Sequence, residues 1–319
     1  MSPEVEVLLR SILDPSRQPA RAELQGLSDL TPRQLIGFDS VWLQAAPERR
    51  RWVTQTLVDL AEDNVELIFD AVFKRLLADT DVEVRRSAIE GLWENRDRTL
   101  ADRLLELLRS DPDESIRAAS ASSLGRFASL IEMRQLDEAT SGRVRSGLLD
   151  VARNSSDSLE VRRRAVESLG FISGDAEILG LLAAAYADPV VRMRASALFA
   201  MGRNCDERWL DILLSALNSE ENELRFEAAR ACGELEDERA VPYLVPLLTE
   251  DEDLEVKLAV VEALGHIGGD RAERALRRAA RDPNDQISAA ANDSLEDAAS
   301  GADSLDFAGR PRGLRPSPN

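Results

Sequence analysis

The side chains best suited to catalysis or metal binding are scarce in this sequence. It contains one histidine, His266, and two cysteines, Cys205 and Cys232. Metal sites and nucleophilic dyads usually need several His or Cys side chains close together. His266 follows a predicted helix, where it can interact with the helix terminus. Cys232 falls where apolar residues recur, which predicts a buried thiol, and the acids beside Cys205 raise the pKa of its thiol. We therefore predict no catalytic residue, no metal site and no cofactor.

The 319-residue chain is strongly acidic, with a net charge of −19. Such a chain is repelled by phosphate backbones and anionic membranes, so we predict neither a nucleic-acid nor a membrane partner. The longest strongly apolar run, residues 178–187, is too short to span a bilayer. Two cysteines are too few for a disulfide framework, and the acidic N-terminus lacks a signal-peptide pattern. These features predict a cytoplasmic protein.

A ten-residue phrase recurs along the chain, and the elements that it forms must position any functional side chains. The clearest copy is 161–170, with the pattern Val-Arg-x-x-Ala-x-x-x-Leu-Gly. The copies end at positions 61, 93, 125, 170, 202, 233, 265 and 296, in steps of 32, 32, 45, 32, 31, 32 and 31 residues. A near-constant period of this length is typical of a solenoid, in which each unit buries its apolar face against the next.

Each repeat is predicted to be a helical hairpin. Asp175 can cap the first helix of one unit, and Asp188 lies in the turn before the second helix, which carries the phrase. At about 100° per residue, Val161, Ala165 and Leu169 fall on one side of the second helix and form its buried stripe. The final Gly is expected to end the helix in the left-handed conformation. The Arg of the phrase and the Asp of a turn can form ion pairs between units.

The Asp…Val-Arg-x-x-Ala-x-x-x-Leu-Gly spacing resembles HEAT repeats, most of all the short type found in the phycobilisome-lyase-like HEAT group. The resemblance covers about residues 31–297. It implies an all-α fold, a right-handed α-solenoid of about eight helical hairpins, and a family made up mostly of scaffolds. Deoxyhypusine hydroxylase has similar repeats and holds iron with His-Glu pairs. Here His266 is followed by Ile267, so that activity is not implied.

Three departures from the repeat set the domain boundaries. Residues 1–30 are predicted to form an N-terminal helical cap, after which Thr31 and Pro32 begin the solenoid as N-cap and first helical residue. The step of 45 holds 13 extra residues near 126–142. We interpret them as a longer first helix with a wider loop, and the alternative is an element that selects a partner. Residues 298–319, rich in Gly, Pro, Ser and Arg, are predicted to be a disordered tail.

Three positions on each second helix point away from the buried stripe. In HEAT proteins the second helices line the concave face. The run from Glu160 to Glu167 has Glu-x-x-Arg-x-x-x-Glu spacing, which we interpret as solvated ion pairs. In later repeats Phe199, Phe226 and Leu258 replace charges, and exposed apolar side chains on a charged surface mark contact sites. The alternative is that these three side chains pack into the next repeat.

We therefore predict a non-enzymatic scaffold that binds a protein or peptide with a basic segment on its acidic concave face. The candidate partner-binding residues are Phe199, Phe226, Leu258, Arg192, Arg230, Glu223, Glu255 and Glu262. The alternative is a lyase-like HEAT protein that serves as an enzyme subunit or chaperone in chromophore attachment or partner modification. A coloured or metal-loaded preparation would favour that alternative.

Overall fold

The structure is a computed structural model that describes the backbone of residues 3–307 and the side chains of residues 5–298. Every regular element in this range is helical, and no strand occurs in it. The chain divides into two compact units, Met1–Leu169 and Gly170–Asn319. The prediction of an all-α solenoid of helical hairpins is confirmed. No helix of the described range is long and apolar enough to cross a bilayer.

The first unit holds ten α-helices. They are α1 (Pro3–Leu13), α2 (Arg21–Leu24), α3 (Pro32–Trp42), α4 (Pro47–Asp63), α5 (Asp70–Leu76), α6 (Val82–Gly91), α7 (Arg98–Ser110), α8 (Glu114–Glu132), α9 (Glu138–Arg153) and α10 (Leu159–Leu169). Helices α5 and α6, α7 and α8, and α9 and α10 pack as pairs, and α4, α6, α8 and α10 pack in that order along the unit. Thr31 caps α3 and Pro32 is its first residue, as the sequence predicted.

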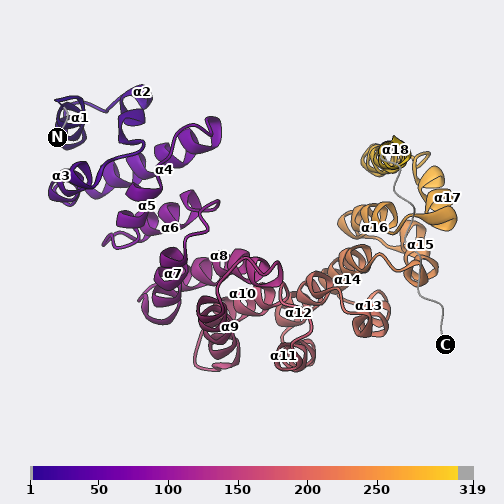
Figure 1. Ribbon diagram of the computed structural model, residues 1–319. Helices are drawn as coiled ribbons and strands as arrows, with labels where there is room; N and C mark the ends of the chain where they lie inside the picture. The colour runs from indigo at the N-terminus through magenta and orange to yellow at the C-terminus, as the bar shows by residue number, and fades with distance from the viewer. Residues whose placement is uncertain (1–2, 308–319) are drawn as a thin grey trace. The chain divides into compact units, whose positions relative to one another are not determined.

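The second unit repeats the same arrangement. Its helices are α11 (Ala176–Tyr186), α12 (Val191–Asn204), α13 (Leu210–Ala216), α14 (Asn222–Leu235), α15 (Val241–Glu250), α16 (Leu254–Ile267), α17 (Gly269–Ala279) and α18 (Asp285–Phe307). Each odd-numbered helix packs on the even-numbered helix that follows it. The second helices α12, α14, α16 and α18 form one row, and the first helices lie beside them in another (Figure 1).

The predicted buried stripe is confirmed on the second helices. Val161, Ala165 and Leu169 of α10 are all 0% exposed. Ala228 occupies the Ala position of the phrase on α14 and is likewise 0% exposed. A small residue at this position lets neighbouring helices approach closely, and a larger one would overpack the core.

The glycine that closes the phrase has a different role from the one expected. Helices α12, α14 and α16 continue past Gly202, Gly233 and Gly265, and none of these glycines has a positive φ. A Cβ added at Gly202 would lie 2.8 Å from the Cα of Ala231 on the next second helix. A Cβ at Gly233 would lie 2.8 Å from the Cα of Ala263 in the same way. Glycine is therefore required for close helix packing at these positions, and the expectation that it ends the helix was wrong there. Helix α10 does end directly before Gly170, but without the expected left-handed conformation.

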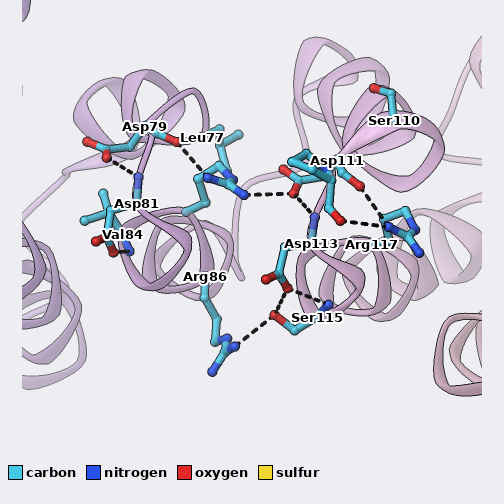
Figure 2. A network of polar contacts seen from close by, with 12 residues as sticks. Leu77, Asp79, Asp81, Val84, Arg86, Ser110, Asp111, Asp113, Ser115 and Arg117 are labelled. Carbon is cyan, nitrogen blue, oxygen red and sulfur yellow. Dashed lines mark hydrogen bonds and ion pairs between the residues drawn. The ribbon is translucent and has the colours of Figure 1, made fainter. Parts of the chain in front are cut away.

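The turns before α6, α8 and α16 use two aspartates for two purposes. Asp111 accepts hydrogen bonds from Arg85 Nη2 at 2.8 Å and from the backbone N–H of Asp113 at 3.0 Å. Asp113 then caps α8 by accepting from the N–H of Ser115. Figure 2 shows Asp111, Asp113 and Ser115 in this network. The first aspartate thus links two repeats, and the second starts the helix.

The same linkage recurs in the second unit, which confirms the predicted ion pairs between repeats. Arg225 donates from Nε and Nη2 to the two carboxylate oxygens of Asp251, at 2.6 and 2.8 Å. Asp251 in turn accepts from the N–H of Asp253, the N-cap of α16. These pairs are shielded from water, since the side chains of Arg225 and Asp251 are 17% and 1% exposed.

The ion pairs of α10 are not solvated as we interpreted them. Arg163 is only 7% exposed. Its guanidinium lies 2.8 Å from a carboxylate oxygen of Glu160 and 3.7 Å from one of Glu167. A charge in this position needs both carboxylates, because an unpaired buried guanidinium would be unstable.

The extra residues near 126–142 lengthen two helices. Helix α8 has 19 residues where α10 has 11, and α9 has 16 where α11 has 11. The sequence interpretation places the extra length in a first helix and its loop, but much of it extends the second helix α8 beyond Gly125. Phe127 and Ala128 in this extension are buried. At the other end of the chain, α18 passes the boundary expected at residue 297 and reaches Phe307; residues 308–319 of the predicted tail lie outside the described residues.

Candidate partner-binding site on the second helices

All eight predicted binding residues lie on three neighbouring second helices of the second unit, α12, α14 and α16. Phe199, Phe226 and Leu258 are half-buried, so they are neither sealed in the core nor free in solvent. Arg230 is half-buried and Glu262 is exposed, and both line the same hollow. The remaining three sit at the starts of their helices and do not line it. They are Arg192, Glu223 and Glu255.

The repeat brings side chains from successive helices into two rows. One row is formed by the seventh position of the phrase, and the other by the residue that follows the closing glycine. The seventh-position row is Phe199, Arg230 and Glu262, and the post-glycine row is Phe171, Arg203, Glu234 and His266. In both rows, taken from these residues onward, an aromatic ring is followed by a guanidinium and then by a carboxylate; the seventh position of the preceding phrase is Glu167. The rows lie side by side because four residues separate them on each helix.

Rings and guanidinium groups alternate across these rows. The guanidinium carbon of Arg203 is 5.8 Å from the centre of the Phe171 ring and 5.5 Å from that of Phe199. Arg230 continues the series, at 5.8 Å from the Phe199 ring and 5.7 Å from the Phe226 ring. All four distances are within the range of cation–π attraction. We call this series, Phe171, Arg203, Phe199, Arg230 and Phe226, the phenylalanine–arginine ladder.

The ladder explains why aromatic side chains are tolerated at the surface. Each arginine holds two rings, and the rings in turn shield the apolar stem of each arginine. Each arginine also reaches a carboxylate: Arg203 lies 3.3 Å from Glu234, and Arg230 lies 3.6 Å from Glu227. Phe199 and Phe226 therefore pack within the chain, on arginines, and still remain half-buried. Their role as a contact site stays a prediction. Leu258 joins no ring contact of the ladder.

A hollow of about 350 Å³ lies next to the ladder. Its lining includes Arg203, Cys205, Arg230, Gly233, Glu234, Glu236, Glu262, Ala263 and His266. Burial raises the pKa of Glu234, and the nearby Glu262 raises it further, while Arg203, Arg230 and His266 act in the opposite direction. The balance leaves the Glu234 carboxylate less stable as an anion than it would be in water.

Two other acids of the hollow are available for an incoming cation. Glu236 and Glu262 are exposed, and neither forms an ion pair with any described side chain. Three carboxylates thus face one small volume in which both arginines are already held by rings and acids. This arrangement can bind a cationic group, and the neighbouring rings can cover the apolar part that carries it.

The two cysteines and the histidine also have defined places. Cys232 is buried, as predicted, and burial raises the pKa of its thiol to about 12. The pKa of the Cys205 thiol is raised mainly by burial of the sulfur and less by Glu234. The sequence analysis attributed the raised pKa to neighbouring acids alone. His266 is in the last turn of α16 and lines the hollow. Among the described residues, no group of three or more His, Cys, Asp or Glu side chains could hold a metal ion.

The post-glycine row was missed in the sequence. We expected each helix to end at its glycine, which assigns Phe171, Arg203 and Glu234 to loops. Phe171 does lie in the turn after α10, but Arg203 and Glu234 are on helices that continue past their glycines. The spacing could have revealed them, since Arg203 follows Phe199 by four residues and Arg230 follows Phe226 by four. Such pairs share a helix face whenever the helix continues.

A family model of HEAT repeats matches this chain over residues 69–146, 145–225, 178–259 and 210–296. No curated protein matches its sequence significantly. Among solved structures, importin beta is 14% identical with a TM-score of 0.51, over 96% of this chain and 48% of that protein. Kap95p, solved in a complex with RanGDP, is 14% identical with a TM-score of 0.52, over 91% of this chain and 45% of that one.

The complex of CpcE and CpcF of phycocyanin lyase from a Nostoc species gives an 18% identical match with a TM-score of 0.49. It covers 83% of this chain and 96% of the matched chain. At 14% identity, the matches to importin beta and Kap95p establish the fold alone.

Proposed function

Because the chain belongs to the HEAT repeat family, we propose that it is a non-enzymatic scaffold that binds a protein or peptide partner on the second helices α12, α14 and α16. The partner segment carries a basic side chain, which enters the hollow beside the phenylalanine–arginine ladder. Importin beta and Kap95p share this fold, and Kap95p binds a protein partner, RanGDP. That comparison supports a binding role in general, and the residues of the hollow supply the specific chemistry.

The observation that carries this proposal is the arrangement of carboxylates in the hollow. Glu234 is held where burial raises its pKa, and Glu236 and Glu262 stand beside it without a cation of their own among the described residues. A lysine or arginine of the partner would compensate Glu234 and pair with the other two acids. Binding would therefore favour the ionised form of Glu234 and strengthen as the pH rises through its pKa.

The ladder gives the site its rigid apolar part. Phe199 and Phe226 are fixed by Arg203 and Arg230 at cation–π distance, so little rotamer freedom remains to be lost when a partner binds. Aromatic and arginine side chains held in this way are the residue types most often found at the energetic centre of interfaces. The basic residue of the partner sets the orientation of the bound segment, and the rings supply contact area.

A random peptide library displayed on phage tests the proposal without requiring that the partner be identified. Peptides selected on the full chain should be enriched in Arg or Lys next to an apolar residue. Their affinity for the Phe226→Ala variant should be roughly tenfold lower, because this substitution removes a half-buried ring from the proposed binding surface. It should fall by a similar factor in the double variant Glu236→Gln/Glu262→Gln.

The double variant Glu207→Gln/Asp211→Asn is the matched control. It removes two exposed acids, Glu207 in the turn before α13 and Asp211 in that helix, neither of which lines the hollow. It therefore changes the net charge by the same amount. Circular dichroism checks that every variant is folded. Selected peptides that lack basic residues, or that bind all four proteins equally, would refute the proposed site.

A further inference from the structure

A second groove of opposite polarity lies on the first helices of the same unit. It has a volume of about 520 Å³ and is lined by Val241, Pro242, Val245, Pro246, Arg271, Arg274 and Arg278. The apolar side comes entirely from α15, and the cationic side entirely from α17. We propose that this groove binds an acidic segment of a partner protein.

The three arginines lie on one face of α17. They follow one another at steps of three and four residues, which keeps them within about 60° around the helix axis and spreads them over roughly 10 Å along it. All three are exposed, and none forms an ion pair with a side chain in the described part of the chain. By contrast, Arg277 on another face of the same helix lies 2.6 Å from Glu273.

Many arginines of this acidic chain, which has 59 acidic residues for 40 basic ones, form ion pairs; Arg163, Arg203 and Arg225 are examples. The three arginines of the groove do not. Acids lie near both ends of the groove: Glu250 and Asp282 line an adjoining hollow together with Arg278, and Glu238 lies close to Gly269 at the start of α17. None of these acids lines the groove itself, where Arg271 and Arg274 form no ion pair among the described side chains.

The α15 side supplies a rigid apolar surface. Val241 and Val245 are four residues apart, as are Pro242 and Pro246, so the four side chains form a continuous strip along the helix. Proline has no side-chain conformations to lose on binding, and both prolines are exposed. An apolar strip facing a line of arginines fits a segment with carboxylates on one side and apolar side chains on the other.

Titration of two labelled peptides against the full chain tests this inference. One peptide carries glutamates at positions i, i+3 and i+7 with leucines on the adjacent face, and the other has lysines in place of the glutamates. We expect the acidic peptide to bind and the basic one not to bind here. Affinity should fall by about tenfold in Arg271→Gln/Arg274→Gln, since each exposed ion pair contributes modestly.

The control is Arg277→Gln/Arg281→Gln, which removes two charges from the same segment but not from the groove. It should bind the acidic peptide like the unmodified chain, and binding should weaken with added salt. Absence of binding up to about 1 mM peptide, or equal losses in both double variants, would overturn the inference. Phosphatidylserine vesicles provide a further comparison: vesicles that bind through Arg271 and Arg274 while the peptide does not would also overturn it.

Discussion

The buried arginine of the phrase can be tested by comparing two adjacent arginines of α6. Arg85 donates to the carbonyl oxygen of Asp79 at 2.9 Å and to the carboxylate of Asp111 at 2.8 Å, and its side chain is 8% exposed. The next residue, Arg86, is 47% exposed and lies 3.4 Å from Glu83. The substitutions Arg85→Met and Arg86→Met remove the same group from one helix, but from opposite environments.

The expected difference follows from what Arg85→Met leaves behind. The Asp111 side chain is only 4% exposed and would keep a single short donor, the N–H of Asp113 at 3.0 Å. Breaking a buried ion pair on one side costs about 3–5 kcal/mol, and methionine retains much of the packing of the arginine stem. We therefore expect a loss of about 3 kcal/mol for Arg85→Met. For the exposed Arg86→Met we expect a loss below about 1 kcal/mol.

Urea unfolding followed by circular dichroism measures both values, with the m-value checking that the transitions are comparable. The double variant Arg85→Met/Asp111→Asn sharpens the test. Asparagine removes the stranded charge but keeps an oxygen that can accept from the N–H of Asp113. More than half of the lost free energy of unfolding should return. Equal losses for Arg85→Met and Arg86→Met, or no recovery in the double variant, would refute the assignment of a buried link between repeats.

Three further predictions concern packing and pH. Gly202→Val should lower the melting temperature, because its Cβ would meet a backbone atom of the next helix at 2.8 Å. Gly180→Ala, where nothing lies within 4 Å of the added Cβ, should raise stability by about 0.5–1 kcal/mol. A Gly202 variant more stable than the Gly180 variant would contradict the packing role. Ala165→Leu and Ala228→Leu should each cost about 1–3 kcal/mol in thermal or urea unfolding, and wild-type curves would show that the stripe is misplaced. Glu234 has a folded-state pKa above its ordinary 4.5, so the stability it contributes at low pH is lost as the pH rises through that folded value. Glu234→Gln should therefore stabilise the chain at pH 7 and lose this advantage below the ordinary pKa, and a pH-independent difference in melting temperature would argue against burial of the carboxylate.

The fold could be predicted from the sequence because the same local pattern of caps and apolar positions recurs in several repeats. The stripe from Val161 to Leu169 and the caps at Thr31 and Asp175 all follow from spacing, helix geometry and hydrogen-bonding chemistry. The same method failed at Gly202, where a glycine can either end a helix or permit close packing. Spacing alone does not distinguish these roles, because the deciding contact comes from a residue about thirty positions away.

The candidate site was predicted in part for the same reason. Phe199 and Phe226 stood out because they replace charges at positions that face away from the core. Their partner Arg203 did not, since it follows the glycine at which the helix was expected to end. The burial of Arg163 was also missed, because a Glu-x-x-Arg-x-x-x-Glu series has the same spacing whether it is solvated or covered by a neighbouring helix.

The joints between the second helices of the second unit all use the same pair of positions. The closing glycine of one phrase meets the eighth residue of the next, which is Ala231, Ala263 or Ser294. Any glycine in this series is therefore complementary in shape to any of the small residues. A gene segment that encodes one repeat could be duplicated or deleted, and the newly adjacent repeats would still fit. Evolution can thus change the length of the array by whole repeats without new joint residues, and each added repeat offers a fresh set of outward-facing positions for selection.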